Sequence, residues 1–354
     1  MRRIAALFVF LCLAGPLSAE PEATKSYGDP SAPRVLTLRS TTDIALVDTL
    51  VDGFVTARPD VRVEYQQWGS NDLFTVTAEA CRTGAAAVDM VISSAVDLQV
   101  KLVNDGCASS YVSPLTRALP GGLNWRDELF GVTREAAVFV YNRDLVAAAE
   151  APRSRFDLID LLRPADSRFA GRVATYDIEA SGLGYLFAFV DSRQATTFGS
   201  LLEAFDRTGA VATCCSAEII DGVASGRYLL AYNVLGSYAL ERAAETPNLV
   251  VVAPEDYTLV LSRAAMIPRG AASPALAGAF LDYMLSEAGQ RAMASNHLIV
   301  DFSDPDPDAD AFYFPTDTRT AFRQIALSPV LLVGLDAQKR ALFLERWRET
   351  FSGP

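Results

Sequence analysis

The stretch that decides the fold is Val88-Asp89-Met90-Val91-Ile92-Ser93-Ser94, together with the helical run that follows it at residues 96–103. A short apolar run containing β-branched residues is typical of a buried strand, and the apolar spacing after it is typical of a helix. Gly106 ends that helix. The two serines stand at the junction between strand and helix. This stretch is therefore a strand–helix unit of a layered α/β protein.

The same alternation extends in both directions along the chain. Toward the N-terminus, strands are expected at residues 35–38 and 61–65, and helices at 44–55 and 70–84. Toward the C-terminus, the expected strands are 136–141, 172–176 and 228–232, with an apolar extended segment at 257–267. Helices are expected from about residue 183, at 216–226, at about 235–244 and from residue 274. Strands that alternate with helices predict parallel βαβ units, and the length suits two domains.

The first residues have the pattern of a secretory signal peptide. Two arginines precede an unbroken apolar run at residues 4–13, and a glycine–proline breaker and small residues follow. The run is shorter than the roughly twenty apolar residues that a membrane-spanning helix needs. We therefore expect cleavage after Ala19 and a periplasmic mature protein that is not inserted into a membrane.

The net charge argues against two classes of partner. The full sequence carries −12, and removal of the two signal arginines changes this to −14. Nucleic acids and anionic membranes require a basic surface, so neither is expected as a partner. The overall charge does not argue against a small anionic ligand, because such a ligand responds to its local site.

Four cysteines remain after the predicted cleavage, which in an oxidising compartment indicates disulfides. Cys81 and Cys107 fall in one predicted lobe, and we expect them to pair. Cys214 and Cys215 are adjacent, so they form a vicinal disulfide or one or both stay reduced. Neither pair has the two-residue spacing of zinc sites, and no metal site is predicted.

Three polar clusters stand where predicted strands give way to helices. They are Ser40-Thr41-Thr42, Ser93-Ser94 and Ser181-Gly182-Leu183-Gly184. In parallel α/β layers, ligands bind at the carboxyl ends of strands, next to helix N-termini. Hydroxyl groups and backbone N–H groups at such places suit a carboxylate or a phosphate. Each cluster alone is also explained as a helix cap.

Longer motifs follow in a characteristic order. Phe130-Gly131-Val132-Thr133 leads into residues 138–143, Ser225-Gly226 precedes the strand at residues 228–233, and residues 272–290 contain a pair of helices. With residues 88–106, these motifs resemble bacterial extracellular solute-binding proteins over residues 34–295. The nearest subgroup is the iron(III)-, phosphosugar- and phosphoglycerate-type binding proteins. The resemblance implies a type II periplasmic-binding-protein fold, in which a hinge joins two α/β lobes and the ligand cleft lies between them.

The resemblance also implies which residues face the cleft. They are Ser40, Thr41, Ser94, Ser181, Gly182, Tyr232 and Ser237, and Tyr238 is either a further member or a core residue; Ser93 belongs to the same candidate set. Iron-binding members use adjacent tyrosines, whereas five residues separate the two tyrosines here. Arg134 falls in the implied hinge and is the candidate cation for a carboxylate or phosphate.

Catalytic patterns are missing from the sequence. His297 is the only histidine, it is remote from every cluster, and no nucleophile elbow or phosphate-binding loop occurs. The acidic segment at residues 301–310 lacks the turn glycine and terminal glutamate of an EF-hand, so a solvated loop is expected. We predict no enzyme activity and no cofactor.

The prediction is therefore a monomeric, periplasmic substrate-binding component of an ABC importer that captures a small, anionic solute and delivers it to a permease. The alternative is a ligand sensor that feeds a histidine kinase. The predicted organisation is a signal peptide at residues 1–19, an extension at 20–33, lobe one at 34–133 plus about 260–300, lobe two at 134–259, and an acidic loop with C-terminal helices at 301–354.

Overall fold

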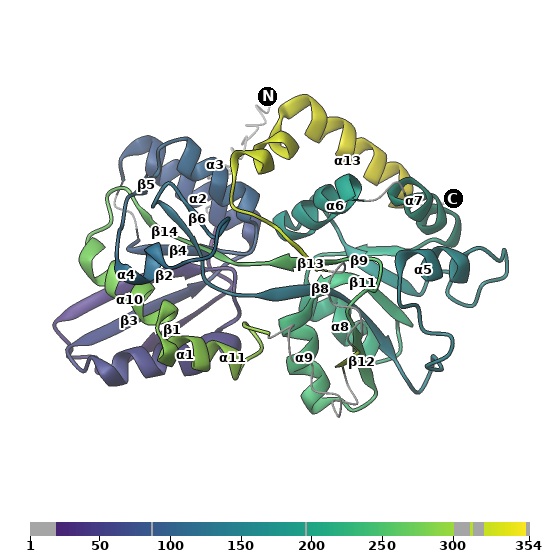
Figure 1. The fold of residues 1–354 in the computed structure, drawn as a ribbon, viewed down its shortest axis with the longest axis horizontal. Coiled ribbons are helices and arrows are strands. Elements are labelled where there is room, and N and C mark those ends of the chain that lie inside the picture. Colours follow the sequence, from purple (N-terminus) through teal and green to yellow (C-terminus); the bar gives the residue numbers. More distant parts are fainter. Residues whose placement is uncertain (1–18, 86–87, 195–196, 301–311, 314–321, 352–354) are drawn as a thin grey trace, which may run out of the picture.

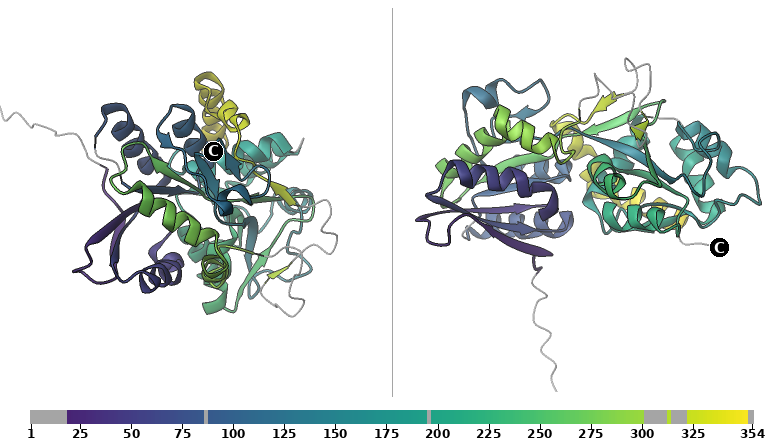
Figure 2. Two further views of the ribbon diagram at one scale, coloured as in Figure 1. Left: turned by 60° about the vertical axis from the view of Figure 1, so that its left-hand side comes forward. Right: turned by 90° about the horizontal axis from the view of Figure 1, so that it is seen from below.

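Two mixed β-sheets, each covered by helices, lie side by side and form two lobes (Figures 1 and 2). This computed structural model describes residues 19–85, 88–194, 197–300, 312–313 and 322–351. The chain begins in the lobe on the left of Figure 1 and passes to the lobe on the right. It then returns to the first lobe before the C-terminal helix crosses the top of the second. The predicted two-lobed α/β fold is confirmed.

The first lobe is built on the sheet with strand order β1-β3-β2-β4-β14-β7-β6, in which β5 pairs with β14. Its strands are β1 (Ala23–Tyr27), β2 (Arg34–Ser40), β3 (Val61–Gln67), β4 (Met90–Ser93), β5 (Ala108–Ser109), β6 (Asn124–Trp125), β7 (Leu129–Gly131) and β14 (Ala264–Pro268). β2 pairs in parallel with β3 and β4, as the βαβ pattern predicts. β1 and β14 pair antiparallel with their neighbours.

The second lobe is built on the sheet with order β10-β9-β11-β8-β12-β15, in which β13 pairs with β8 and β16. Its strands are β8 (Glu135–Asn142), β9 (Val173–Tyr176), β10 (Val211–Thr213), β11 (Leu230–Leu235), β12 (Leu249–Val252), β13 (Thr258–Leu261), β15 (Phe312–Tyr313) and β16 (Phe322–Gln324). β9 is parallel to β10 and β11, whereas the central strand β8 is antiparallel to β11, β12 and β13.

Helices connect and cover both sheets. In the first lobe they are α1 (Ile44–Ala57), α2 (Ser70–Thr83), α3 (Val96–Asn104), α4 (Pro114–Arg117), α10 (Pro274–Leu285) and α11 (Glu287–Ala294). In the second lobe they are α5 (Arg155–Leu162), α6 (Gly182–Gln194), α7 (Phe198–Thr208), α8 (Ser216–Ala224) and α9 (Gly236–Glu245). The 3₁₀ helix η1 (Pro329–Leu335) and α13 (Ala337–Phe351) follow.

The apolar pattern explains these elements. In α1, six apolar residues at helical spacing are buried, from Leu46 to Val55, and form the stripe that packs on the sheet. α2 ends where predicted because Gly84 takes the left-handed conformation, with φ of 69°. β8 is buried along its whole length, because helices and neighbouring strands enclose it.

Several segments join the lobes. The chain passes from β7 to β8, and it returns from β13 to β14 through Ser262 and Arg263. The sequence predicted one extended segment at residues 257–267, but the structure divides it between the two sheets at this polar pair. At the C-terminus, η1 packs on α3 of the first lobe and α13 packs on α7 of the second.

Three further predictions concern segments toward the ends of the chain. The predicted extension at residues 20–33 contains β1, which pairs with β3 over its whole length. The predicted signal peptide lies outside the described residues except for Ala19, and the acidic segment at residues 301–310 also lies outside them. No helix in the part of the chain that the structure describes is long and apolar enough to cross a membrane.

Candidate functional site

A cavity of about 330 Å³ lies between the lobes and is lined by both. This volume is in the range of small-molecule sites. The first lobe contributes Glu22, Thr41, Asp43, Gln67, Trp68, Gly69, Ser70 and Ser94. The second lobe contributes Tyr176, Ala180, Ser181, Leu183, Cys214, Cys215, Ser216, Ala217, Leu235 and Tyr238, and the connection between β13 and β14 contributes Arg263. We call this cavity the pocket.

Helix N-termini from both lobes converge on the pocket. Its lining includes the N-cap residues of α1, α2, α8 and α9, and residues within two positions of the start of α3 and α6. None of α1, α2, α3, α8 or α9 has a side-chain N-cap hydrogen bond. Because a helix N-terminus carries partial positive charge and N–H groups without intrahelical partners, the ends of α2, α3, α8 and α9 favour an anion. At α1 the N-cap carboxylate of Asp43 opposes an anion, and the Ile44 N–H already donates to Gln67 Oε1 at 3.1 Å.

Thr41 and Ser94 form a hydroxyl pair at the carboxyl ends of β2 and β4. Their side-chain oxygens lie 3.1 Å apart, and the Ser94 N–H donates to Thr41 Oγ1 at 2.9 Å. The bond between the two hydroxyls uses only one of their two hydrogens. The other hydrogen is available for donation into the pocket that both residues line.

Direct hydrogen bonds join the lobes beside the pocket. The Gly182 N–H at the start of α6 donates to Ser70 Oγ at the start of α2, at 2.9 Å. The side-chain amide of Asn71 donates to the carbonyl oxygens of Glu179 and Ala180, both at 2.9 Å. These contacts hold α2 against α6 and define one wall of the pocket.

Arg263 is the one basic side chain among the pocket-lining residues. It is about 1% exposed and makes a two-pronged ion pair with Glu135, from Nε at 2.9 Å and Nη2 at 3.2 Å. Its Nη1 donates to the Thr41 carbonyl oxygen at 3.2 Å. Burial alone would lower the pKa of Arg263, but the Glu135 carboxylate together with Tyr238 and Tyr65 outweighs burial and raises it, so the guanidinium stays charged.

Acidic and phenolic groups also reach the pocket. Tyr238 in the second lobe donates from its hydroxyl to Asp43 Oδ1 in the first, at 2.8 Å. Burial, together with the Asp43 carboxylate, raises the pKa of Tyr238 well above its usual value, although Arg263 opposes the shift. Glu22, beside β1, is the second pocket carboxylate and accepts from the side-chain amide of Gln67 at 3.3 Å.

The structure brings only some of the predicted site residues into the pocket. Thr41, Ser94, Ser181 and Tyr238 line it. Four others are buried and do not line it: Ser40 bonds to Thr42, Ser93 accepts from the N–H of Ala95, Gly182 bonds to Ser70, and Ser237 donates to Glu135.

Two predicted site residues lie elsewhere. Tyr232 is buried inside the second lobe, where its hydroxyl contacts Asp191 and Arg155, and it does not face the pocket. Tyr232 therefore does not line the pocket, because β11 places its side chain in the apolar core of the second lobe. Arg134 is exposed and lies outside the pocket lining, and its backbone pairs with Ile299.

Three residues that line the pocket were not predicted from the sequence: Arg263, Asp43 and Trp68. Arg263 had a usable signal, because a charged residue interrupts the apolar run at residues 257–267. Asp43 follows the first hydroxyl cluster directly and is the N-cap of α1. Trp68 gave no signal that separates a pocket residue from a core residue.

Both cysteine pairs are disulfides in the structure. The predicted Cys81–Cys107 bond is confirmed, with a Cα–Cα distance of 5.4 Å. Cys214 and Cys215 form a vicinal disulfide, one of the alternatives that the sequence left open. Within the described residues, one group with metal-ligand spacing contains these two cysteines and Glu218, but disulfide sulfurs are not thiolate ligands.

Comparisons with known proteins agree with this architecture. Residues 36–298 match the family described as bacterial extracellular solute-binding protein. The substrate-binding protein of an ABC transporter from Agrobacterium tumefaciens is 32% identical and has a TM-score of 0.85; the match covers 94% of this chain and 99% of that one. No curated protein matches the chain.

Two further solved structures share the fold. Iron-bound HitA from Pseudomonas aeruginosa is 18% identical with a TM-score of 0.69, and covers 89% of this chain and 99% of its own. The periplasmic binding protein AfuA from Actinobacillus pleuropneumoniae, with fructose-6-phosphate bound, is 15% identical with a TM-score of 0.69, and covers 90% and 99%. The chain therefore belongs to the bacterial extracellular solute-binding proteins of ABC-transporter type.

Proposed function

We propose that this protein is the periplasmic substrate-binding component of an ABC importer and that it captures a small anionic solute in the pocket between its lobes. The observation that carries the proposal is the convergence of uncapped helix N-termini from both lobes on one cavity. Each such terminus contributes about 0.3–1 kcal/mol near an anion. The protein acts by binding and release, without turnover.

The donor set favours an anion held mainly by hydrogen bonds. Hydroxyl groups of Thr41, Ser70, Ser94, Ser181 and Ser216 line the pocket. Arg263 adds a cation whose charge Glu135 largely balances. The role that the sequence assigned to Arg134 therefore passes to Arg263.

The pocket carboxylates narrow the solute class. Glu22 and Asp43 line the same cavity as the donors, and an anionic group close to either would be repelled. The anionic end of the solute is therefore expected at the helix N-termini and hydroxyl groups. Near the carboxylates we expect neutral hydroxyl groups or an amine.

Closure couples binding to recognition by the permease. A solute that contacts α2 of the first lobe and α8 of the second stabilises the state in which both contacts exist. The shift toward this closed state cannot exceed the difference between the solute's affinities for the closed and open states. Hydrogen bonds such as Asn71 to Ala180 stabilise the same state.

A thermal-shift screen of refolded, ligand-free protein tests the solute class. Carboxylates, phosphate esters, sugars, amino acids and ferric chelates are compared. A true solute at about one hundred times its Kd stabilises the fold by about 2.7 kcal/mol, which raises the Tm by several degrees. A neutral sugar or a ferric chelate as the sole hit contradicts the anion.

Two neighbouring serines test the pocket itself. Ser94→Ala removes a pocket hydroxyl and is expected to weaken binding about tenfold or more, as loss of a hydrogen bond to a charged group does. Ser93→Ala removes only the hydrogen bond to the Ala95 N–H, so it is the matched control with about 1 kcal/mol lost in stability and unchanged affinity. Equal affinities in the two variants would place the site elsewhere.

The proposed location has its own test. N-terminal sequencing of the exported protein is expected to begin at Glu20, after removal of residues 1–19. Soluble cytoplasmic protein that retains Met1 would contradict export.

A further inference from the structure

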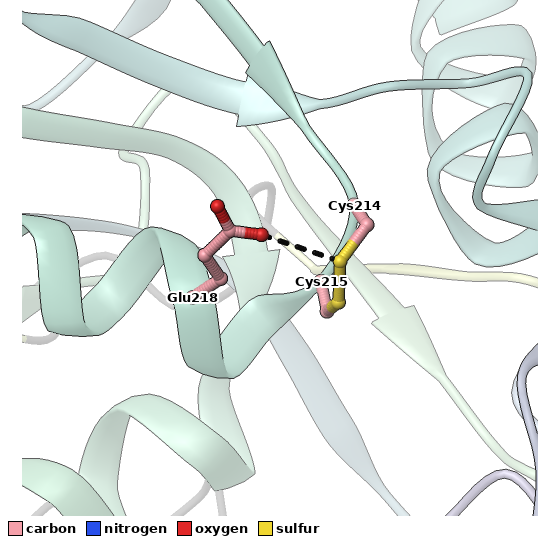
Figure 3. A group of neighbouring side chains, drawn as sticks. All are labelled: Cys214, Cys215 and Glu218. Atoms are coloured by element: carbon pink, nitrogen blue, oxygen red, sulfur yellow. Dashed lines mark hydrogen bonds between the residues drawn. A yellow bond between two sulfur atoms is a disulfide. The ribbon is translucent and has the colours of Figure 1, made fainter. Parts of the chain in front are cut away.

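The Cys214–Cys215 disulfide is part of the pocket wall. Both residues line the cavity and both are exposed. Cys214 follows β10, and Cys215 is the N-cap of α8, so the disulfide occupies the turn from strand to helix (Figure 3). A reductant or a solute that enters the pocket therefore meets this bond directly.

The position of this disulfide separates it from a bond that stabilises the fold. A disulfide stabilises mainly by restricting the unfolded chain, and the restriction grows with the length of the closed loop. The Cys81–Cys107 bond spans 26 residues, whereas the Cys214–Cys215 bond joins neighbours that the chain already holds together. The Cys214–Cys215 bond therefore contributes little to global stability. Its main structural effect is expected to be local, at the turn that it closes.

The local effect falls on the start of α8. The disulfide closes a small covalent ring around the peptide between the two cysteines and so restricts the backbone angles on each side of it. That backbone aims the first N–H groups of α8, and Ser216 and Ala217 beside them line the pocket. Because no side chain caps α8, these N–H groups are directed by the backbone alone.

Reduction changes both the backbone and the side chains at this turn. Cys214 Sγ lies 3.3 Å from Glu218 Oε2, the contact drawn in Figure 3. A disulfide sulfur carries no hydrogen, so this contact becomes an S–H···O hydrogen bond only after reduction. The thiol of Cys214 would then be held by Glu218, while the freed backbone loses its restriction.

We propose that the Cys214–Cys215 disulfide orders the start of α8 as part of the pocket, so that the oxidised protein binds solute more tightly than the dithiol form. In the switching step a dithiol reductant breaks the Cys214–Cys215 bond and forms its own disulfide. Two electrons and two protons pass to the cysteine sulfurs. This inference rests on the proposed function of the pocket.

The first test needs no solute. Limited dithiothreitol treatment, followed by alkylation and peptide mass mapping, is expected to reduce Cys214–Cys215 before Cys81–Cys107, because Cys107 is only 4% exposed. Hydrogen exchange at residues 219–221, the first N–H groups of α8 that bond within the helix, is then expected to be at least about fivefold faster, since opening of a loosened helix start costs less. The start of α9, which also lines the pocket, is the internal control. Equal exchange at residues 219–221 before and after confirmed reduction overturns the inference.

The second test measures binding. Inorganic phosphate, citrate and phosphoserine are titrated into the oxidised protein, the reduced protein and a C214A/C215A double variant, in which alanine cannot cap α8. We expect about tenfold weaker binding in the last two and no further effect of dithiothreitol on the double variant. Faster exchange with unchanged affinity also overturns the inference. If no probe binds any form, the proposed anion site fails, and the exchange experiment alone decides whether the disulfide orders α8.

Discussion

Arg263 and Arg155 are two buried arginines in similar surroundings with different access to the pocket. Both are about 1% exposed, and both form an ion pair with a buried carboxylate, Glu135 or Asp191 respectively. Both also lie against tyrosine rings, at 5.7 Å from Tyr238 for Arg263 and 3.7 Å from Tyr257 for Arg155. Only Arg263 lines the pocket.

The difference between them arises from the connection between the sheets. Arg263 stands where the chain leaves β13 of one sheet and enters β14 of the other, so its side chain reaches the space between the lobes. Arg155 begins α5 within the second lobe and bonds to Tyr232, Asp256 and the Tyr257 carbonyl. A buried ion pair therefore indicates a binding role only where its surroundings open to a ligand.

The largest expected effect is on stability at the enclosed arginine. Arg155→Met leaves Asp191 buried without its cation, which costs about 3–5 kcal/mol and lowers the Tm by roughly 10 °C. The affinity of the remaining folded protein for its solute is expected to be unchanged. Chemical denaturation measures the free energy of unfolding, and calorimetric titration measures the affinity for the solute. A changed affinity would contradict the expectation that Arg155, unlike Arg263, has no role in binding.

Asp97 extends the comparison to a buried carboxylate without an ion-pair partner. Its Oδ1 has no hydrogen-bond partner, and burial raises its pKa from 3.8 to about 7, with Arg340 opposing the shift. Because the folded-state pKa is the higher one, its stabilising contribution is complete below about pH 4. It is lost at about 1.4 kcal/mol per pH unit as the pH rises to about 7.

The Asp97→Asn variant isolates this effect. It is expected to unfold at a higher temperature than the parent at pH 8 and to lose that advantage by pH 4. Thermal melts across this pH range give the difference between the Tm values of the two proteins. The contributions of all other carboxylates cancel in this difference. A difference that does not change with pH would show that Asp97 is ionised in the folded protein.

A smaller effect is expected from the partner of Arg263. Glu135→Gln preserves the shape of the side chain but removes the negative charge that balances the guanidinium. An anionic solute should then bind up to about tenfold more tightly, equivalent to about 1.4 kcal/mol, although the fold is less stable. Asp191→Asn beside Arg155 is the matched control. If Glu135→Gln does not change the affinity for the solute, the charge of Arg263 does not contribute to binding that solute.

The smallest effect is expected from Arg134, the arginine that the sequence favoured. Arg134→Ala changes an exposed side chain outside the pocket, so the free energy of solute binding should change by less than about 0.5 kcal/mol. The solute-dependent rise in Tm in the same thermal-shift assay measures this change. If Arg134→Ala abolishes the rise in Tm caused by the solute, Arg134 rather than Arg263 is the cation that binds it.

The two arginines also show which features of the structure can be predicted from the sequence and which cannot. Periodicity placed most of the strands and helices correctly, because burial of a strand or a helix face leaves a local pattern. It did not show that residues 257–267 belong to two sheets, since both β13 and β14 are buried and apolar. Which arginine meets the pocket depends on that division.

The same limit applies to the polar clusters. Thr41, Ser94 and Ser181 were predicted because a strand-to-helix junction is a local feature. No local feature of the sequence distinguishes Tyr232 from Tyr238. Tyr232 faces the core of the second lobe, where its hydroxyl contacts Asp191, whereas the Tyr238 hydroxyl donates to Asp43 of the first lobe. The vicinal disulfide was left open because its state depends on redox chemistry as well as on sequence.

The position of β14 has a consequence for how the chain reaches its native state. β14 lies between β4 and β7, yet residues 94–263, with every strand of β5 to β13, separate it from β4 in the sequence. A nascent chain therefore presents the open edge of β4 until synthesis has passed residue 268. Contacts between such distant segments form slowly, and an uncovered strand edge can pair with another chain. Chains interrupted before β14 should consequently aggregate, even though every strand–helix unit of their first hundred residues is present.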